Sequence, residues 1–167
     1  MRLIVIMAVT LALAGCTRRT HDAPSSSMEP TIQAGSKVTI DYTAYQTEQP
    51  SRFDIVAFHP QSLPTAIFTF RVIGLPGEAV TLTDAAVLID GKKVSPPDAL
   101  RYAPVASGIN QTNLTVAQFF LLGDNTAKAR DSRYLGPINR NQIFGKVVRI
   151  EQPDGAVTQE SARSAAP

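Results

Sequence analysis

The sequence has no tryptophan, one cysteine and two histidines among its 167 residues. A single cysteine excludes a disulfide framework and a cysteine-rich metal site, and two histidines are too few for a histidine-based one. We therefore expect neither a metal nor another cofactor. The formal net charge is only +2, from 16 basic and 14 acidic residues, which gives no reason to expect a nucleic-acid partner. With 44% hydrophobic and 18% charged residues, the composition is typical of one globular domain.

Long apolar stretches are also missing, except for the thirteen residues from Leu3 to Gly15. As a helix this run spans about 20 Å, short of the roughly 30 Å hydrocarbon core of a bilayer. A positive charge before it and small residues at its end are typical of a secretory signal. Residues 13–16, L-A-G-C, resemble a bacterial lipobox, which implies removal of residues 1–15 and lipidation of Cys16. The alternative is an uncleaved signal anchor with an incidental cysteine.

The resemblance to a lipobox places the protein in the cell envelope, anchored in a membrane through Cys16 and facing away from the cytoplasm. Thr17 stands where an aspartate would resemble an inner-membrane retention signal, so the outer membrane is favoured in a Gram-negative cell. We expect residues 16–24 to form a flexible tether, 25–152 to form the domain, and the polar residues 153–167 to be a disordered tail.

Short apolar or alternating segments dominate the domain, and none has a long helical period. The segment 87–94 contains Asp90-Gly91 between two apolar stretches and predicts a hairpin. Strands are expected at residues 38–42, 54–58, 67–73, 119–122 and 144–150. The pattern therefore predicts an all-β fold.

Four segments carry a family resemblance when they are taken in order. They are S-S-S-M-E-P-T at residues 25–31, R-F-D-I-V-A-F at 52–58, F-R-V-I-G-L-P-G-E at 70–78, and G-D-N-T-A-K-A-R-D-S-R-Y-L-G-P at 123–137, followed by I-F-G-K-V at 143–147. Each segment alone is unspecific. Together they resemble the type I signal peptidases, serine endopeptidases that cut exported pre-proteins after small residues at the membrane surface.

This resemblance implies antiparallel sheets like those of the self-cleaving SOS repressor domains, with a Ser nucleophile, a Lys general base and no metal. Ser27 matches the nucleophile and Ser25 the residue that helps bind the oxyanion. A lysine can act as the base when burial lowers its pKa, and the tetrahedral intermediate needs hydrogen-bond donors. Asp131 and Arg133 are expected to form an ion pair behind the site.

The sequence departs from this pattern where the chemistry is most demanding. Phe70 occupies the position of the Lys base, and the guanidinium of Arg71 cannot replace it because it stays protonated. Ala129 stands where many members have a Ser that hydrogen-bonds the Lys. Both changes turn a polar pocket into an apolar one, which favours weak or absent hydrolysis.

Two functions remain open from the sequence. One is an active endopeptidase with a substitute base, for which the candidates are Lys128, His21, Lys37 and His59. His21 has a suitable chemistry but lies in the expected tether, which would position a base poorly. The other is an inactive member of the family that binds exported peptides or a partner protein in the cleft.

Overall fold

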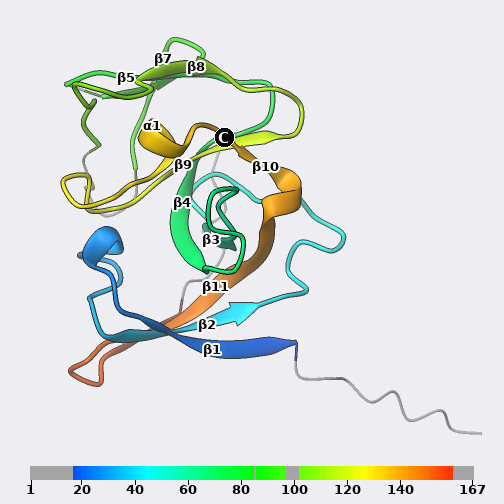
Figure 1. Cartoon of the computed structure of the whole chain (residues 1–167), viewed down its shortest axis with the longest axis vertical. Coiled ribbons are helices and arrows are strands. Elements are labelled where there is room, and N and C mark those ends of the chain that lie inside the picture. The colour runs from blue at the N-terminus through cyan, green and yellow to red at the C-terminus, as the bar shows by residue number, and fades with distance from the viewer. Residues whose placement is uncertain (1–16, 85, 97–101, 160–167) are drawn as a thin grey trace, which may run out of the picture.

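Alternating side chains along β2 (Ser36–Asp41) show how the pattern becomes structure, because Val38 and Ile40 are buried while Lys37 is exposed. The computed structural model describes residues 17–84, 86–96 and 102–159. These residues form two antiparallel sheets, a large one that runs from the bottom of Figure 1 up to β9 and β10, and a small one at its top. The prediction of an all-β fold of antiparallel sheets is confirmed.

The large sheet supplies most of the segments that carry the family resemblance. Its order is β1 (Arg18–Ala23), β2, β11 (Ile143–Glu151), β3 (Ile55–Phe58), β4 (Phe68–Gly74), β9 (Gln118–Leu122) and β10 (Ile138–Asn139), with β12 (Val157–Gln159) paired to β11. The strands expected at 38–42, 54–58, 67–73, 119–122 and 144–150 correspond to β2, β3, β4, β9 and β11.

The small sheet has the order β7 (Lys92–Val94), β6 (Val87–Ile89), β5 (Ala79–Leu82) and β8 (Gln111–Asn113). The expected hairpin is β6–β7, and both of its turn residues have positive φ, 51° at Asp90 and 76° at Gly91. Short helical turns complete the described part of the chain: η1 (Ser26–Met28), α1 (Ser132–Leu135) and η3 (Arg140–Gln142).

Two apolar clusters lie in the interior. One involves residues of the large sheet together with Met28, and the other packs β5 and β6 against Phe120 and Leu122 of β9. At the end of β4 the backbone of Gly74 approaches the second cluster closely, because a methyl group added there would lie 2.5 Å from Val80 and 2.8 Å from Leu114.

The prediction of a tether over residues 16–24 is wrong for residues 18–23. This segment is β1, paired in register with β2 from Arg18↔Asp41 to Ala23↔Ser36. β1 lies at the edge of the sheet and most of its side chains are exposed, so a polar sequence without apolar alternation can form this strand. Backbone pairing with β2 therefore fixes a segment that was expected to be a flexible tether.

The predicted disordered tail also begins too early. Residues 157–159 form β12, which pairs with Arg149–Glu151 of β11. Residues 160–167 lie outside the described part, as do the expected signal segment 1–15 and Cys16. Among the described residues, no helix has the length and apolar character needed to cross a membrane.

Candidate functional site

Ser27 lies in η1, which begins three residues after the end of β1. Met28 is 1% exposed and anchors this turn in the core, whereas Ser27 is only half-buried. The backbone N–H of Asn125 donates to the Ser27 carbonyl at 3.0 Å, and Asn125 Nδ2 donates to the Ser26 carbonyl at 3.1 Å. The G-D-N segment thus holds the turn that carries Ser27. The sequence alone did not predict this role for Asn125.

The expected oxyanion donors bond to each other in this structure. The Ser27 backbone N–H donates to Ser25 Oγ at 3.2 Å. For both groups to donate to a substrate oxygen, the Ser25 side chain has to rotate away from this N–H. The role of Ser25 stays a prediction.

Phe70 lies on β4 opposite Val56 of β3 and is 3% exposed. Its ring centroid is 5.7 Å from that of Phe58 and 6.0 Å from that of Phe68. Burial in this aromatic cluster is favourable for a phenyl ring and costly for an ammonium group. The side chain at the expected base position is therefore part of the core.

Gly123 shows how close the expected site residues are to one another. A methyl group added there would lie 2.4 Å from Ala129 Cβ, 2.6 Å from the Ser27 carbonyl oxygen and 3.2 Å from Phe70 Cε1. The last two distances place the Ser27 oxygen and the Phe70 ring atom at most about 6 Å apart. The structure thus brings Ser27, Phe70 and Ala129 together, and the prediction that Ser27 lies within about 8 Å of the Phe70 side chain is confirmed.

Arg71 points into a buried ionic network. It is 1% exposed and donates from Nε to Asp124 Oδ1 at 2.9 Å and from Nη2 to Asp124 Oδ2 at 2.6 Å. Asp124 also accepts from the hydroxyls of Thr31 at 2.5 Å and Tyr102 at 2.7 Å. Burial, together with the charge of Asp124, raises the pKa of Tyr102, which keeps its hydroxyl protonated and able to donate.

This network joins the segment after Ser27, strand β4 and the G-D-N segment. The sequence singled out Arg71 and the motif that contains Asp124, but it did not indicate that the two residues pair. Tyr102 was missed altogether, because nothing in its local sequence marks it.

The expected ion pair between Asp131 and Arg133 is present and buried. Arg133 Nε and Nη2 lie 2.8 Å from the two carboxylate oxygens of Asp131, and the two residues are 1% and 0% exposed. Asp131 Oδ2 also accepts from the backbone N–H of Gly123 at 3.0 Å. The pair therefore supports the backbone around which Ser27, Phe70 and Ala129 meet.

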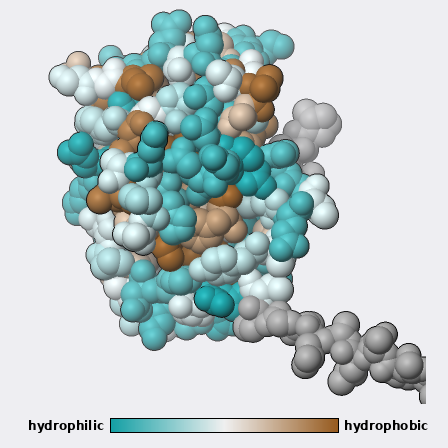
Figure 2. Space-filling model, turned by 45° about the vertical axis from the view of Figure 1, so that its right-hand side comes forward, coloured by the Kyte–Doolittle hydropathy of each residue, from teal (hydrophilic) through white to brown (hydrophobic). Residues whose placement is uncertain are grey.

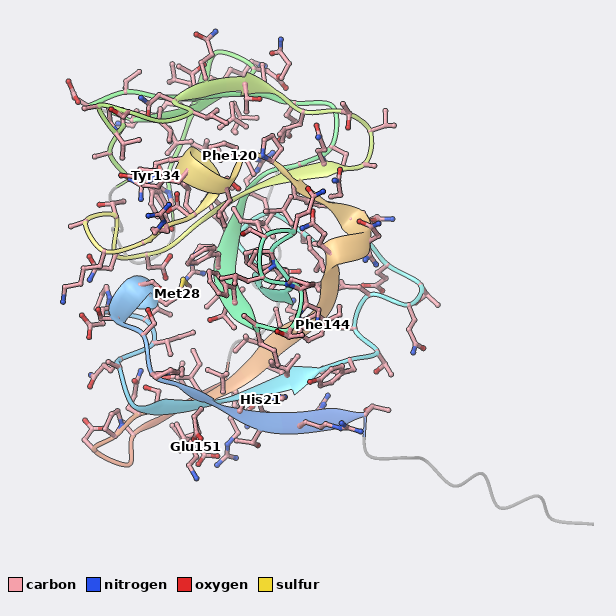
Figure 3. All side chains as sticks on the ribbon, in the orientation of Figure 1. His21, Met28, Phe120, Tyr134, Phe144 and Glu151 are labelled. Atoms are coloured by element: carbon pink, nitrogen blue, oxygen red, sulfur yellow. The ribbon has the colours of Figure 1, made fainter. Side chains whose placement is uncertain are left out.

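A cleft of about 580 Å³ opens beside Ser27. In Figure 3, Met28 on η1 and His21 on β1 mark two of the elements that border it. Most of its walls are apolar, and Figure 2 shows apolar side chains gathered in the middle of one face between hydrophilic ones. The lining residues are His21, Asp22, Ala23, Pro24, Ser25, Ser27, Met28, Ile32, Val38, Ile67, Phe68, Thr69, Phe70, Lys128 and Arg130.

Two of the four candidate bases line this cleft, and two do not. His21 lines the cleft. It lies on strand β1 and not in a flexible tether, and its Nε2 is 2.8 Å from the Tyr42 hydroxyl. Lys128 also lines the cleft, and its Nζ lies 3.9 Å from Glu29 Oε2. Lys37 and His59 are not among the residues that line it.

Comparison with known proteins agrees with the resemblance seen in the sequence. Residues 1–150 match the model of a family described as signal peptidase, peptidase S26. The chain is 34% identical over 133 residues to a probable signal peptidase I-2 of Synechocystis sp., covering 74% of this chain and 58% of the relative. It is 35% identical over 138 residues to a signal peptidase I of Leptolyngbya laminosa, covering 75% and 64%.

A third relative, signal peptidase I V of Bacillus subtilis, is 30% identical over 137 residues, covering 75% of this chain and 80% of the relative. Among solved structures, a signal peptidase I from Enterococcus faecalis V583 is 29% identical with a TM-score of 0.49, covering 60% of this chain and 97% of that one. The chain spans less than two thirds of the length of the Synechocystis and Leptolyngbya relatives.

Proposed function

Because the chain belongs to the signal peptidase family, peptidase S26, we propose that its cleft binds the cleavage region of exported pre-proteins and hydrolyses them weakly or not at all. Binding is supported by the apolar cleft beside Ser27. Weak hydrolysis is supported by one observation above all, the buried Phe70 ring at the position of the family's lysine.

Without a base, the Ser27 hydroxyl keeps its proton and is a poor nucleophile. General-base assistance typically contributes about 10²–10⁴-fold, so its loss leaves only what positioning and the oxyanion donors supply. Arg71 offers no substitute, since it stays charged and is bound to Asp124. Ala129 is also buried and apolar, which agrees with a site that no longer holds an ammonium group.

We also propose that Cys16 is lipidated and holds the domain at a membrane of the cell envelope. The L-A-G-C sequence after a short apolar run supports this anchor. The backbone N–H of Tyr42 donates to the Thr17 carbonyl at 2.9 Å. A lipid on the neighbouring Cys16 would therefore be attached at the edge of the large sheet.

Cleavage and binding of a labelled pre-protein by the full chain test the proposal. We expect the wild type to cleave at or only slightly above the rate of Ser27→Ala, while both bind the pre-protein equally well. Ser62→Ala, in an exposed loop, is the matched serine control. Robust wild-type cleavage that disappears in Ser27→Ala but not in Ser62→Ala would contradict the proposal.

A gain-of-function variant tests the chemical reason separately. Phe70→Lys with Ala129→Ser restores the family's base and its polar partner, and we expect cleavage above the wild-type level. Circular dichroism must show that the variant is folded, because an ammonium buried in an apolar cluster can unfold the domain. Ser27→Ala added to this pair should abolish the gain.

A second function is favoured by one observation, that His21 and Lys128 line the same cleft as Ser27. Either side chain could serve an active endopeptidase as an unusual base. In that case wild-type cleavage is lost in Ser27→Ala and also in His21→Ala or Lys128→Ala. Loss in only one of the latter two variants would identify the base.

A further inference from the structure

We propose that the cleft is a receptor for peptides that end in a free carboxylate next to Ser27, with Lys128 and Arg130 recognising that charge. The inference rests on the proposed function, since it names the kind of exported peptide that the same cleft binds. A signal peptide released by another peptidase belongs to this chemical class, because hydrolysis leaves it a new C-terminal carboxylate.

The walls of the cleft suit the apolar body of such a peptide. Ile67, which is 39% exposed, and the half-buried Phe68 contribute apolar surface to it, and the buried side chains of Met28, Ile32 and Phe70 also line it. Burying apolar side chains here stabilises the bound peptide in proportion to the apolar surface removed from water. Apolar contact alone does not distinguish a peptide end from a segment inside a longer chain.

The charged side chains of the cleft supply that distinction. Lys128 and Arg130 are exposed and flank Ala129, whose Cβ lies at most about 5 Å from the Ser27 carbonyl oxygen, given the distances around Gly123. Both cations therefore stand on the loop that closes against Ser27. The side-chain hydroxyls of Ser25 and Ser27 line the same cleft and can donate to a carboxylate.

Counting Lys, Arg, Asp and Glu, the described residues that line the cleft carry a formal charge of +1, from Lys128 and Arg130 against Asp22. Glu29 is not among the lining residues, and its Oε2 lies 3.9 Å from Lys128 Nζ. The Arg130 guanidinium lies 5.7 Å from the centre of the Tyr134 ring and has no carboxylate partner among residues 17–84, 86–96 and 102–159. Arg130 is thus available to an incoming anion.

A carboxylate gains more from this arrangement than an internal peptide bond does. Hydrogen bonds between charged partners are roughly twice as strong as those between neutral groups. A pre-protein that runs through the cleft places a neutral amide beside Ser27, whereas a released peptide places a full negative charge there. The absence of a base at Phe70 does not weaken this binding, because no proton has to move.

The test uses three fluorescein-labelled peptides with the sequence of residues 7–15, M-A-V-T-L-A-L-A-G. One has a free C-terminal acid, one a C-terminal amide, and one continues for five further residues. Binding to the full chain is followed by fluorescence anisotropy. We expect the acid to bind about tenfold more tightly than the other two, equivalent to about 1.4 kcal/mol, with a preference that shrinks as salt is added.

Charge-neutralising variants assign the effect to the two cations. Lys128→Gln with Arg130→Gln should reduce the preference for the acid to less than about twofold while the amide binds as before. Lys92→Gln with Lys93→Gln, an exposed pair on β7 outside the cleft lining, removes the same charge and should keep the preference.

Each outcome distinguishes this inference from the proposed function. Equal binding of acid, amide and extended peptide overturns the inference and leaves the proposed function intact. A preference that survives in the Lys128/Arg130 variant, or falls equally in the Lys92/Lys93 variant, also overturns it. If none of the three peptides binds, both proposals fail.

Discussion

Single residues decide the chemistry of this site. Phe70 and Ala129 stand where the family resemblance implies a cation and a hydroxyl, and both are buried around Gly123 next to Ser27. Packing is as tight there as elsewhere in a protein core, since an added methyl group would meet three neighbours. The apolar replacements thus contribute to stability at a place where the family pattern implies catalysis.

Gly123→Ala tests this packing. The new methyl group would lie 2.4 Å from Ala129 Cβ and 2.6 Å from the Ser27 carbonyl, so backbone has to shift. We expect the free energy of unfolding to fall by about 1–3 kcal/mol in urea denaturation. Ala127→Ser, exposed in the same loop, should change it by less than about 0.5 kcal/mol. Equal stability of Gly123→Ala and the wild type would contradict the packing described here.

At the scale of elements, β1 forms a wall of the cleft that the sequence did not predict. It pairs with β2 along its whole length and brings His21 and Ala23 to the cleft wall. Arg18 Nε on β1 donates to Asp41 Oδ2 on β2 at 2.9 Å. Burial raises the pKa of Asp41, but the hydrogen bonds from Thr43 and Arg18 lower it more, so that it lies below its usual value.

This lowered pKa predicts an acid-sensitive attachment of β1. A carboxyl whose pKa is lower in the folded state contributes stability above its ordinary pKa of about 4, and loses that contribution as the pH falls further. The Arg18 side chain is 62% exposed, so we expect a small effect, roughly 0.2–1 kcal/mol.

Hydrogen-exchange protection of Arg18–Ala23, corrected for intrinsic rates, is the measurement. It should decrease between pH 6 and pH 3 in the wild type and should be lower at pH 6 in Asp41→Asn, with less further change on acidification. Asp84→Asn, at an exposed position, should behave like the wild type. Unchanged protection of β1 in Asp41→Asn at pH 6 would count against the role of this pair.

At the scale of the whole molecule, the proposed anchor at Cys16 directly precedes, in the sequence, the residues at the edge of the large sheet. Thr17 is hydrogen-bonded to Tyr42, and consecutive Cα atoms are only about 3.8 Å apart. A lipid on Cys16 would therefore hold the sheet edge close to the membrane surface, without a tether between them. The cleft, which β1 borders, would then lie near the membrane as well.

Intact-mass analysis of protein extracted from membranes tests the anchor. We expect a chain that begins at Cys16, lacks residues 1–15 and carries the added mass of acyl groups. Cys16→Ser should move the protein out of the detergent-extracted fraction, because it removes the acyl chains and the remaining thirteen-residue apolar run is too short to span a bilayer. An unmodified N-terminal Met1, or unchanged partitioning of Cys16→Ser, would be the contrary result.

The sequence by itself determined the all-β fold and the family, and it predicted that the lysine base is missing. Period-two alternation and turn chemistry act locally, and the identity of a residue such as Phe70 is independent of folding.

The tertiary structure decided that residues 18–23 form a strand, that His21 is fixed by Tyr42, and that Arg71, Thr31 and Tyr102 converge on Asp124. These features depend on pairing between residues far apart in the chain. The polar edge strand carries no apolar alternation, and the partners of a buried charge leave no local pattern in the sequence.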